Sequence, residues 1–365
     1  MNIALVIPYN PLEEIGGLEV GTVRLAQAFK KLGHKPIIVT KGKSGKRSGI
    51  FIKGKKNMAE ISNWLIKNDR LDIVQWMEIF PEPEEINIQC FASGLLRHFG
   101  KKVFLMVATS KNLEKRGDGK LTKTLIKNAF DGYIISNSDQ IREFKKYGIT
   151  ENIFPFGFGI DTKDIFYPIS STNKIELRKQ LNLPVDKTLL LFMGRFVERK
   201  RADFLLNVWC NLTHLYDKTS LVMVGSGMGQ HDSNEKKIIN LIKRSSNLIH
   251  REFGPKLNPS EYYQASDMLI LPSDREGQPN VLLEAMACGI PVIGSNIPGI
   301  VELLHDKENG FVFSVNNPQE LSQAIEELVE NEELRINLGK EGRKLILRMK
   351  DIYYVAKQYI KIYEK

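Results

Sequence analysis

Short apolar runs of strand length alternate with longer amphipathic segments along most of the 365 residues of this chain. In the longer segments, such as Val20–Leu32 and Ala202–Tyr216, apolar residues recur three and four positions apart, which is typical of helices. A repeating strand and helix order predicts parallel sheets with helices on both faces, and hence an α/β fold. The predicted strands are Ile3–Ile7, Pro36–Thr40, Ile73–Gln75, Val103–Ala108, Tyr133–Ser136, Thr188–Met193, Ser220–Val224, Leu248–Arg251, Met268–Leu271 and Pro291–Gly294.

The chain is long enough for two domains of ordinary size, each with its own core. The segment 155–183 is rich in Gly, Pro and Ser and marks a boundary between them. Near the other end, helices are predicted at Ser322–Glu330, Glu333–Arg348 and Asp351–Tyr363. The last of these has an apolar face that must be buried, and one alternative is that it is an additional helix of the second domain; the face consists of Ile352, Val355, Tyr359 and Ile360.

Composition indicates a soluble, folded protein, because 42% of the residues are hydrophobic and 26% are charged. No apolar run approaches the roughly 20 residues that a membrane-spanning helix needs. Met1 leads directly into a predicted strand, so we expect no secretory signal. The three cysteines, Cys90, Cys210 and Cys288, are widely spaced and indicate neither a disulfide framework nor a zinc site. A reducing cytoplasm is the simplest compartment.

The net charge of +9 is concentrated in the first half of the chain. Residues 1–168 hold 26 Lys and Arg against 18 Asp and Glu, a net charge of +8. The densest basic segment, Lys41–Lys56, contains no acid; its cations are Lys41, Lys43, Lys46, Arg47, Lys53, Lys55 and Lys56. Such a segment can contact an anionic membrane or acceptor, or it can be a solvated loop. Nucleic acid is not expected, since no recognition-helix or stacking motif accompanies the segment.

Two carboxylates, Glu276 and Glu284, flank a predicted junction between a loop and a helix. Pro279 suits the first positions of a helix and Gly289 suits its end, so the helix should span Asn280–Cys288. The junction follows one predicted strand and precedes another, which places it at the carboxyl edge of a parallel sheet, where such folds bind ligands. A helix N-terminus there favours a phosphate. The alternative is that Glu276 caps the helix and Glu284 is a solvated surface residue.

Four blocks in the same order resemble the family 4 retaining glycosyltransferases, which have the GT-B fold and an E-x7-E motif. They are Gly16-Gly17-Leu18-Glu19, Phe158–Asp161 with Phe166–Pro168, Gly194-Arg195 to Lys200, and Glu276 to Glu284. The resemblance implies two Rossmann-like domains whose parallel sheets face a central cleft, with the C-terminal helix crossing back to the first domain. It implies an acceptor-binding domain of residues 1–168 and 351–365, and a donor-binding domain of residues 169–350.

The resemblance also implies roles for individual residues. Arg195 and Lys200 would neutralise the diphosphate of the donor, although an ion pair with Glu198 is an alternative for either. Glu276 would bind hydroxyls of the donor sugar rather than act as a nucleophile, and Glu284 would bind the ribose. Further donor contacts are expected from Gly16, Gly17, Gly194, Gly225, Gly227, Phe253, Gly277, Gln278, Pro279, Asn280 and Val281.

Two departures from the family pattern concern this site. Lys200-Arg201 stands where relatives usually have Lys-Gly, which puts the backbone freedom of that position in doubt. The histidine that many relatives carry after the fourth strand is absent, and Ser110, Lys111 and Asn112 could take over its contacts. With Glu19, these three residues are the acceptor-side candidates.

The chain contains no Asp-x-Asp and no His/Cys cluster with metal spacing, so we expect an enzyme that needs neither metal nor cofactor. The expected function is retaining transfer of a hexose from a nucleoside diphosphate sugar to an acceptor hydroxyl of a glycolipid, cell-surface polysaccharide or other glycoconjugate. The alternatives are an epimerase or phosphorylase of the same fold, or a non-enzymatic basic binding protein. The expected location is cytoplasmic, with peripheral contact to the inner membrane face left open. UDP, GDP and ADP donors are not distinguished.

Overall fold

The computed structural model describes residues 1–13, 16–107, 120–227, 233–254 and 257–365. Its internal contacts separate two units: unit 1 is Met1–Gly159 with Lys350–Lys365, and unit 2 is Ile160–Met349. The boundary expected from the sequence lay at residue 168. Contacts place it at residue 159, because Ile160 and Phe166 are buried in the core of unit 2.

Unit 1 is built on an eight-stranded sheet in the order β3-β4-β2-β1-β5-β6-β7-β8, as far as the described residues extend. Neighbouring strands are parallel except for the antiparallel pair β3 and β4. The strands are β1 (Asn2–Val6), β2 (Lys35–Lys41), β3 (Gly45–Arg47), β4 (Ile50–Lys55), β5 (Ile73–Trp76), β6 (Lys102–Val107), β7 (Gly132–Ile135) and β8 (Ile153–Phe154).

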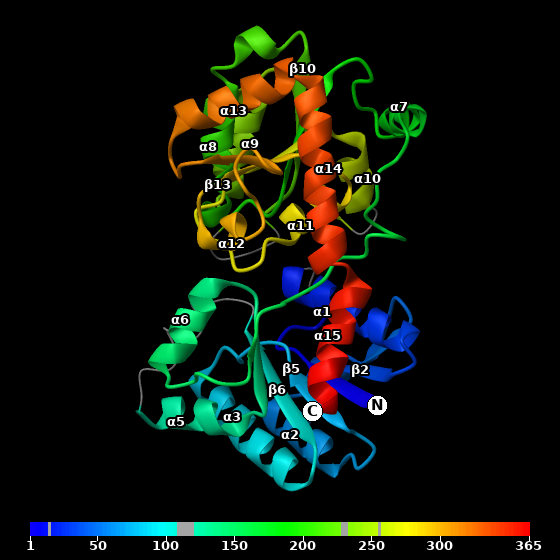
Figure 1. Ribbon diagram of the computed structural model, residues 1–365, viewed down its shortest axis with the longest axis vertical. Helices are drawn as coiled ribbons and strands as arrows, with labels where there is room; N and C mark the ends of the chain where they lie inside the picture. The colour runs from blue at the N-terminus through cyan, green and yellow to red at the C-terminus, as the bar shows by residue number, and fades with distance from the viewer. Residues whose placement is uncertain (14–15, 108–119, 228–232, 255–256) are drawn as a thin grey trace. The chain divides into compact units, whose positions relative to one another are not determined.

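Helices cover both faces of this sheet (Figure 1). Alternate residues of β1, β2, β5, β6, β7 and β8 enter one of two cores, as the pleat of a strand requires, and β4 adds Ile50 and Ile52 to one of them. One core lies under α2 (Met58–Lys67), α3 (Pro83–His98), α5 (Lys120–Ala129) and α6 (Ser138–Lys146), and the other lies under α1 (Gly17–Lys31) and α15 (Ile352–Glu364).

The helix α15 is part of unit 1 although unit 2 precedes it in the chain. Asp351 caps it by accepting from the N–H groups of Tyr353 and Tyr354. Its apolar face is buried beside α1, and the Tyr359 hydroxyl donates to the Gly157 carbonyl at 3.1 Å. The Tyr363 hydroxyl donates to the side chain of Gln75 on β5 at 3.2 Å. The helix is therefore not an additional helix of unit 2.

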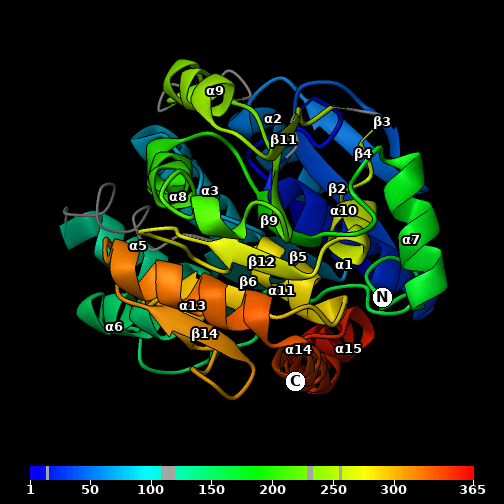
Figure 2. The same cartoon turned by 90° about the horizontal axis from the view of Figure 1, so that it is seen from above.

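Unit 2 contains a six-stranded, all-parallel sheet in the order β11-β10-β9-β12-β13-β14. Seen from above, α13 runs lengthwise beside it, whereas α14 is seen nearly end-on (Figure 2). The strands are β9 (Thr188–Met193), β10 (Thr219–Val224), β11 (Leu248–Arg251), β12 (Met268–Leu271), β13 (Val292–Ser295) and β14 (Gly310–Phe313). The helices are α7 (Ser171–Gln180), α8 (Ala202–Trp209), α9 (Glu235–Arg244), α10 (Pro259–Ala265), α11 (Asn280–Ala287), α12 (Pro298–Val301), α13 (Pro318–Glu330) and α14 (Glu332–Met349).

The expected α/β class with two parallel sheets is confirmed. The helix predicted over Ala202–Tyr216 is wrong, because α8 ends at Trp209 and a short 3-10 turn, Thr213–Leu215, follows. Trp209 and Leu215 enter the same core, and an uninterrupted helix would not bring both there. No helix of the described residues is long and apolar enough to cross a membrane.

The basic segment Lys41–Lys56 is not a loop. Most of it forms β3 and β4, a hairpin at the edge of the sheet in which Ile50 and Ile52 are buried. Lys46 is directly opposite Phe51, whose side chain is 43% exposed. Buried and outward residues alternate at the start of β4, but the outward residues include lysines and only Ile50 and Ile52 are buried, which makes the strand hard to predict from the sequence.

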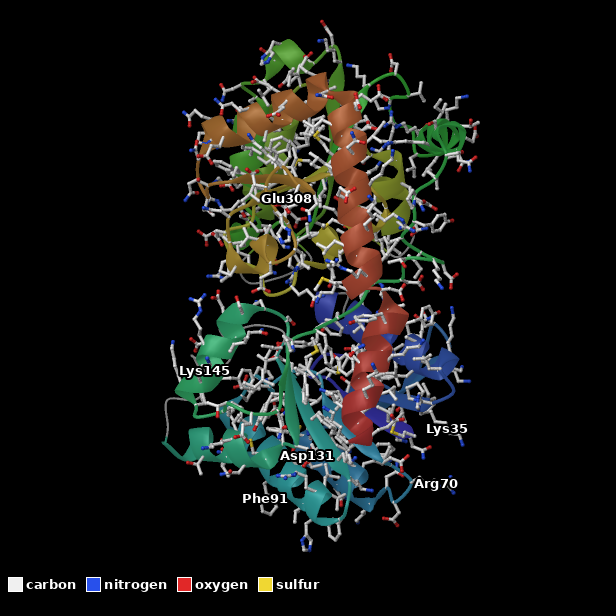
Figure 3. All side chains as sticks on the ribbon, viewed as in Figure 1. Lys35, Arg70, Phe91, Asp131, Lys145 and Glu308 are labelled. Carbon is white, nitrogen blue, oxygen red and sulfur yellow. The ribbon has the colours of Figure 1, made fainter. Side chains whose placement is uncertain are left out.

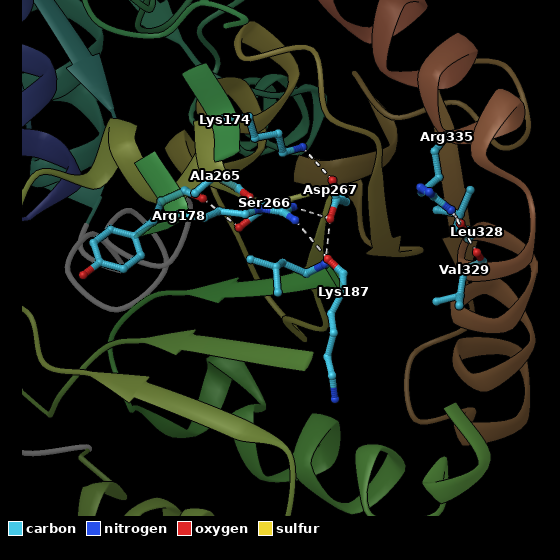
Figure 4. A network of polar contacts seen from close by, with 11 residues as sticks. Lys174, Arg178, Lys187, Ala265, Ser266, Asp267, Leu328, Val329 and Arg335 are labelled. Atoms are coloured by element: carbon cyan, nitrogen blue, oxygen red, sulfur yellow. Dashed lines mark hydrogen bonds and ion pairs between the residues drawn. The ribbon is translucent and has the colours of Figure 1, made fainter. Parts of the chain in front are cut away.

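A partly buried ionic network joins α7 to the sheet of unit 2 (Figure 4). The carboxylate of Asp267, just before β12, accepts from the Leu189 N–H at 2.7 Å and from Lys174 Nζ and Arg178 Nη2, both at 2.6 Å. Arg178 also donates to the Ala265 carbonyl at 2.8 Å. Burial would raise the pKa of Asp267, but Lys174 and Arg178 outweigh it and hold that pKa below its usual range.

Candidate functional site in unit 2

Three loops meet at the carboxyl edge of the unit 2 sheet, after the adjacent strands β9, β12 and β13. The loop after β12 begins with Pro272 and Ser273 and carries Glu276. The Asp274 N–H donates to the Arg199 carbonyl of the loop after β9 at 3.0 Å, and Arg199 Nη1 donates to the Arg275 carbonyl at 3.3 Å. These two bonds fasten the first two loops to each other.

The third loop closes against the second through small residues. The hydroxyl of Ser295, at the end of β13, donates to the Ser273 carbonyl. Gly299, in α12, has no room for a side chain, since a Cβ there would lie 2.6 Å from the carbonyl oxygens of Glu276 and Gly277. The close backbone approach therefore requires glycine at position 299.

Glu276 is the centre of this arrangement, with a side chain that is 6% exposed. Its Oε1 accepts from Lys200 Nζ at 2.5 Å and from the Ser273 hydroxyl at 2.8 Å, and its Oε2 accepts from Arg199 Nη1 at 3.1 Å. Glu276 does not cap α11, whose N-cap is Pro279 without a side-chain bond. Lys200 pairs with Glu276 and not with the exposed Glu198, which was the alternative.

The charges around Glu276 keep it ionised. Burial would raise the pKa of Glu276, but Lys200 and Arg199 outweigh burial and hold that pKa below its usual range. Burial lowers the pKa of Lys200, an effect that Glu276 opposes and that the nearby Arg199 and Arg195 add to. An ionised carboxylate is an acceptor only, so Glu276 can receive hydrogen bonds from ligand hydroxyls.

Glu284 lies one turn inside α11 and is 7% exposed. Its Oε2 accepts from the hydroxyl of Tyr263 on α10 at 2.8 Å. The alternative that Glu284 is a solvated surface residue is therefore wrong. Between the two carboxylates, Gly277, Gln278 and Asn280 are partly buried, Pro279 is buried, and Val281 packs on the core.

The loop after β10 lies against the loop after β9. A Cβ on Gly225 would lie 2.1 Å from the Gly194 carbonyl, so only glycine fits there. Gly194 N–H donates to the Val224 carbonyl at 3.0 Å, and Gly227 N–H donates to Glu235 Oε1 at 2.8 Å. Phe253, in the segment after β11, is partly buried against the unit 2 core. Residues 228–232 and 255–256 lie outside the described part of the chain.

Arg201 occupies the position where the resemblance implies glycine, and it adopts the left-handed conformation that favours glycine, with φ of 51° and ψ of 36°. Its guanidinium lies over the ring of Phe204, 5.5 Å from the centroid. The doubt about backbone freedom is thereby resolved: the arginine accepts the conformation, and a contact between a cation and an aromatic ring offsets part of the strain.

In unit 1, Gly16 is the N-cap of α1, Gly17 begins that helix, and Glu19 is 4% exposed in its first turn. The loop before them rests on the basic segment Lys41–Lys56: Asn10 Nδ2 donates to the Lys43 carbonyl at 3.0 Å, and Arg47 donates to the Pro11 carbonyl. The candidates Ser110, Lys111 and Asn112 lie outside the described residues.

Of the residues predicted from the sequence, unit 2 brings Lys200 and Glu276 into direct contact. Other residues of the same loops were not predicted. Arg199, Ser273, Ser295 and Gly299 were missed. The only signal for Ser273 was its position after a predicted strand, and the signal for Gly299 was the neighbouring Pro298, which suits a helix start. In the described residues, no three His, Cys, Asp or Glu side chains are placed to hold a metal ion.

The family match lies within unit 2, whereas similar solved structures cover both units. The family model described as "Glycosyl transferases group 1" matches residues 173–345. The N,N'-diacetylbacillosaminyl-diphospho-undecaprenol alpha-1,3-N-acetylgalactosaminyltransferase of Campylobacter jejuni is 30% identical over 236 residues, which are 64% of this chain and 60% of that protein. The chain spans about half to three fifths of the length of the curated relatives that it matches first.

Solved structures share the fold over the full length. A glycosyltransferase from Rickettsia africae has a TM-score of 0.81 at 20% identity, covering 100% of this chain and 97% of that one. Anabaena Alr3699/HepE in complex with UDP-glucose has a TM-score of 0.81 at 16% identity, covering 99% of each chain. The chain therefore has the two-unit GT-B fold of solved glycosyltransferases, and its residues 173–345, which contain Arg199, Lys200 and Glu276, match the glycosyl transferases of group 1.

Proposed function

We propose that this protein is a retaining glycosyltransferase of family 4 that moves a hexose from a nucleoside diphosphate sugar to an acceptor hydroxyl without a metal ion. The observation that carries the proposal is Glu276, a buried carboxylate held between Lys200 and Arg199 at the carboxyl edge of a parallel sheet. That edge is where open α/β folds bind ligands. The match over residues 173–345 and the fold shared with a complex of UDP-glucose support it.

The proposed chemistry follows from the charges. As the bond from the sugar to the diphosphate breaks, negative charge grows on the leaving group, and preorganised cations stabilise that charge most strongly in the transition state. Arg195 and Lys200 are the cations assigned to this task. Glu276 binds sugar hydroxyls; a carboxylate that already accepts three hydrogen bonds is poorly suited to attack as a nucleophile. The acceptor attacks from the side of the leaving group, and a phosphate oxygen takes its proton.

The acceptor is proposed as a glycolipid, polysaccharide or other glycoconjugate. The Campylobacter relative is named for a lipid-linked acceptor, and other relatives are named for capsular polysaccharide and lipopolysaccharide core biosynthesis. Acceptor binding is assigned to unit 1, where the acceptor-side candidate Glu19 lies in the first turn of α1.

The purified protein should bind one of UDP, GDP or ADP, and should release that nucleoside diphosphate from its sugar in EDTA. Binding raises the apparent melting temperature by mass action. Thermal shift and diphosphate release with a panel of donors measure both effects, and the anomeric configuration of the product, read by NMR, tests retention. Loss of activity in EDTA would contradict the metal-independent assignment.

The same experiment separates the alternatives. A phosphorylase would release sugar phosphate when inorganic phosphate is added, and an epimerase would convert the donor sugar without an acceptor. A protein that binds no nucleoside diphosphate but binds polyanions tightly would be a binding protein with a degenerate site.

We also propose that unit 1 contacts an anionic membrane at the cytoplasmic face through the hairpin β3–β4. Phe51 is exposed, Lys46 lies opposite it, and Lys53 follows two residues later on the same face of the strand. An exposed aromatic ring flanked by lysines suits the interface of an anionic bilayer. Lys41 contributes less, because it is paired with Glu85 at 3.0 Å.

Changing Lys46→Gln and Lys53→Gln together should weaken binding to vesicles containing phosphatidylglycerol roughly 30-fold, at about 1 kcal/mol per lysine. The control is Lys35→Gln with Lys145→Gln, which removes the same charge from two other side chains at the surface of unit 1 (Figure 3). Vesicle cosedimentation at two salt concentrations measures the effect. Equal losses in both double variants would mean that net charge, and not this hairpin, attracts the vesicle.

A further inference from the structure

Arg199 was not among the predicted donor-binding residues, yet it contacts both Glu276 and the backbone of the loop after β12. Its guanidinium pairs with Glu276 Oε2 at 3.1 Å and reaches the Arg275 carbonyl at 3.3 Å, while its own carbonyl accepts from the Asp274 N–H. The side chain is 25% exposed, so it lies at the mouth of the cluster, whereas Lys200 beneath it is 10% exposed. Arg199 therefore has access to a ligand and also holds Glu276.

The charge balance of the cluster depends on this arginine. Lys200 and Glu276 form a close ion pair and cancel each other's charge. Arg195 lies near enough to Lys200 to influence its ionisation, and Arg199 lies on the other oxygen of Glu276. The four side chains together therefore carry two net positive charges. Without Arg199 they would carry one.

We infer that Arg199 is a further donor-site residue, which positions Glu276 and supplies one of the two net positive charges that match the dianionic diphosphate of a nucleotide sugar. This inference rests on the proposed function. An arginine suits both tasks, because its planar group donates several hydrogen bonds at once and stays charged at every relevant pH. The four side chains thus select an anionic diphosphate group in preference to a neutral nucleoside.

The test compares a diphosphate with its own nucleoside. Among UDP, GDP and ADP, the one that wild type binds most tightly is titrated by calorimetry, and the matching nucleoside is titrated alongside. Arg199→Gln should bind the diphosphate about tenfold more weakly, since it loses a charge-assisted contact. Binding of the nucleoside should stay within about twofold, because it lacks the charge.

Three further variants make the result specific. Arg199→Met should also bind the diphosphate more weakly while its affinity for the nucleoside stays nearly unchanged. Arg199→Lys keeps the charge, so its affinity for the diphosphate should stay within about threefold of wild type. Arg201→Gln is the matched control on the same loop, because its guanidinium lies over Phe204; its diphosphate affinity should equal that of wild type. Urea unfolding of each variant checks that the loops remain folded.

Two results would overturn the inference while leaving the proposed function intact. One is unchanged diphosphate affinity in Arg199→Gln. The other is an equal loss for diphosphate and nucleoside that Arg199→Lys does not rescue, which would make Arg199 a structural tie between loops. If wild type bound none of the three diphosphates, the proposed function and the inference would fall together.

Discussion

Replacing Glu276 with glutamine should lower the rate of nucleoside diphosphate release from the donor sugar at least about a hundredfold, the range seen when a preorganised polar contact at a reacting centre is lost. Glutamine has the shape of glutamate but not its charge, so it orients the sugar hydroxyls poorly and leaves Lys200 and Arg199 without their counter-charge. Steady-state kinetics with the donor found in the panel measure this effect.

The same change should destabilise unit 2. Lys200 is buried, and removing the partner of a buried ion pair costs about 3 to 5 kcal/mol. This loss in the free energy of unfolding should become smaller as pH rises. Burial already lowers the pKa of Lys200, and without Glu276 the lysine can release its proton more easily. Urea unfolding at pH 6 and pH 9 checks the direction. Kinetics must therefore be measured well below the melting temperature of the variant.

Glu198→Gln is the control for both effects. Glu198 lies on the same loop, is exposed, and was the alternative partner of Lys200. Its replacement should leave the rate and the free energy of unfolding close to those of wild type, since exposed pairs contribute about 0 to 1 kcal/mol. If Glu198→Gln matched Glu276→Gln, the assignment of Glu276 would be contradicted.

Asp267→Asn should lower the free energy of unfolding of unit 2 by about 3 kcal/mol or more. The asparagine can still accept from the Leu189 N–H, but Lys174 and Arg178 lose their counter-charge, and Arg178 is only 7% exposed. Asp139→Asn in α6 is the matched control, because Asp139 pairs with an Arg142 that is 73% exposed. The control should change stability by less than about 1 kcal/mol. Urea unfolding at pH 7 measures both.

The pH dependence has a defined sign. The pKa of Asp267 is lower in the folded protein than in the unfolded chain, so its contribution is present above the ordinary aspartate pKa of about 3.9 and is lost as pH falls through the lower, folded value. Wild type should therefore lose stability below about pH 4 more steeply than Asp267→Asn. Parallel curves for the two proteins between pH 5 and pH 3 would show that Asp267 does not hold its charge in the folded state.

The sequence predicts most of the sheet because buried parallel strands appear as continuous apolar runs. The sequence misses β3, β4, β8 and β14. The strands β3 and β8 have only three and two residues, β4 carries lysines on its outward face, and β14 is a four-residue apolar strand that begins with a glycine. The helix predicted through Tyr216 fails for another reason. Its periodicity continues past Trp209, but tertiary packing turns the chain there so that Leu215 can enter the core.

In the site, too, local sequence patterns predict some features and tertiary packing decides the others. Glu276, Lys200 and Glu284 were predicted from their positions beside strand ends and from resemblance. Contact between Lys200 and Glu276, 76 positions apart, depends on β9 and β12 being neighbours in the sheet, an order that local patterns do not contain. Ser273 and Gly299 act through a hydroxyl and through the lack of a side chain, features too common in sequences to mark a site.

The return of α15 to unit 1 has a consequence for synthesis in the cell. Unit 2 is one uninterrupted segment, so all of it has been translated before the ribosome reaches residue 350. Unit 1 is translated first in large part, yet Val355, Tyr359 and Tyr363 of α15 fill one of its two cores. Until they emerge, α1 alone covers that face of the sheet, and the part that α15 would cover stays exposed. Unit 1, most of which precedes unit 2 in the chain, is therefore expected to finish folding after unit 2, and during that interval the chain has greatest need of chaperones.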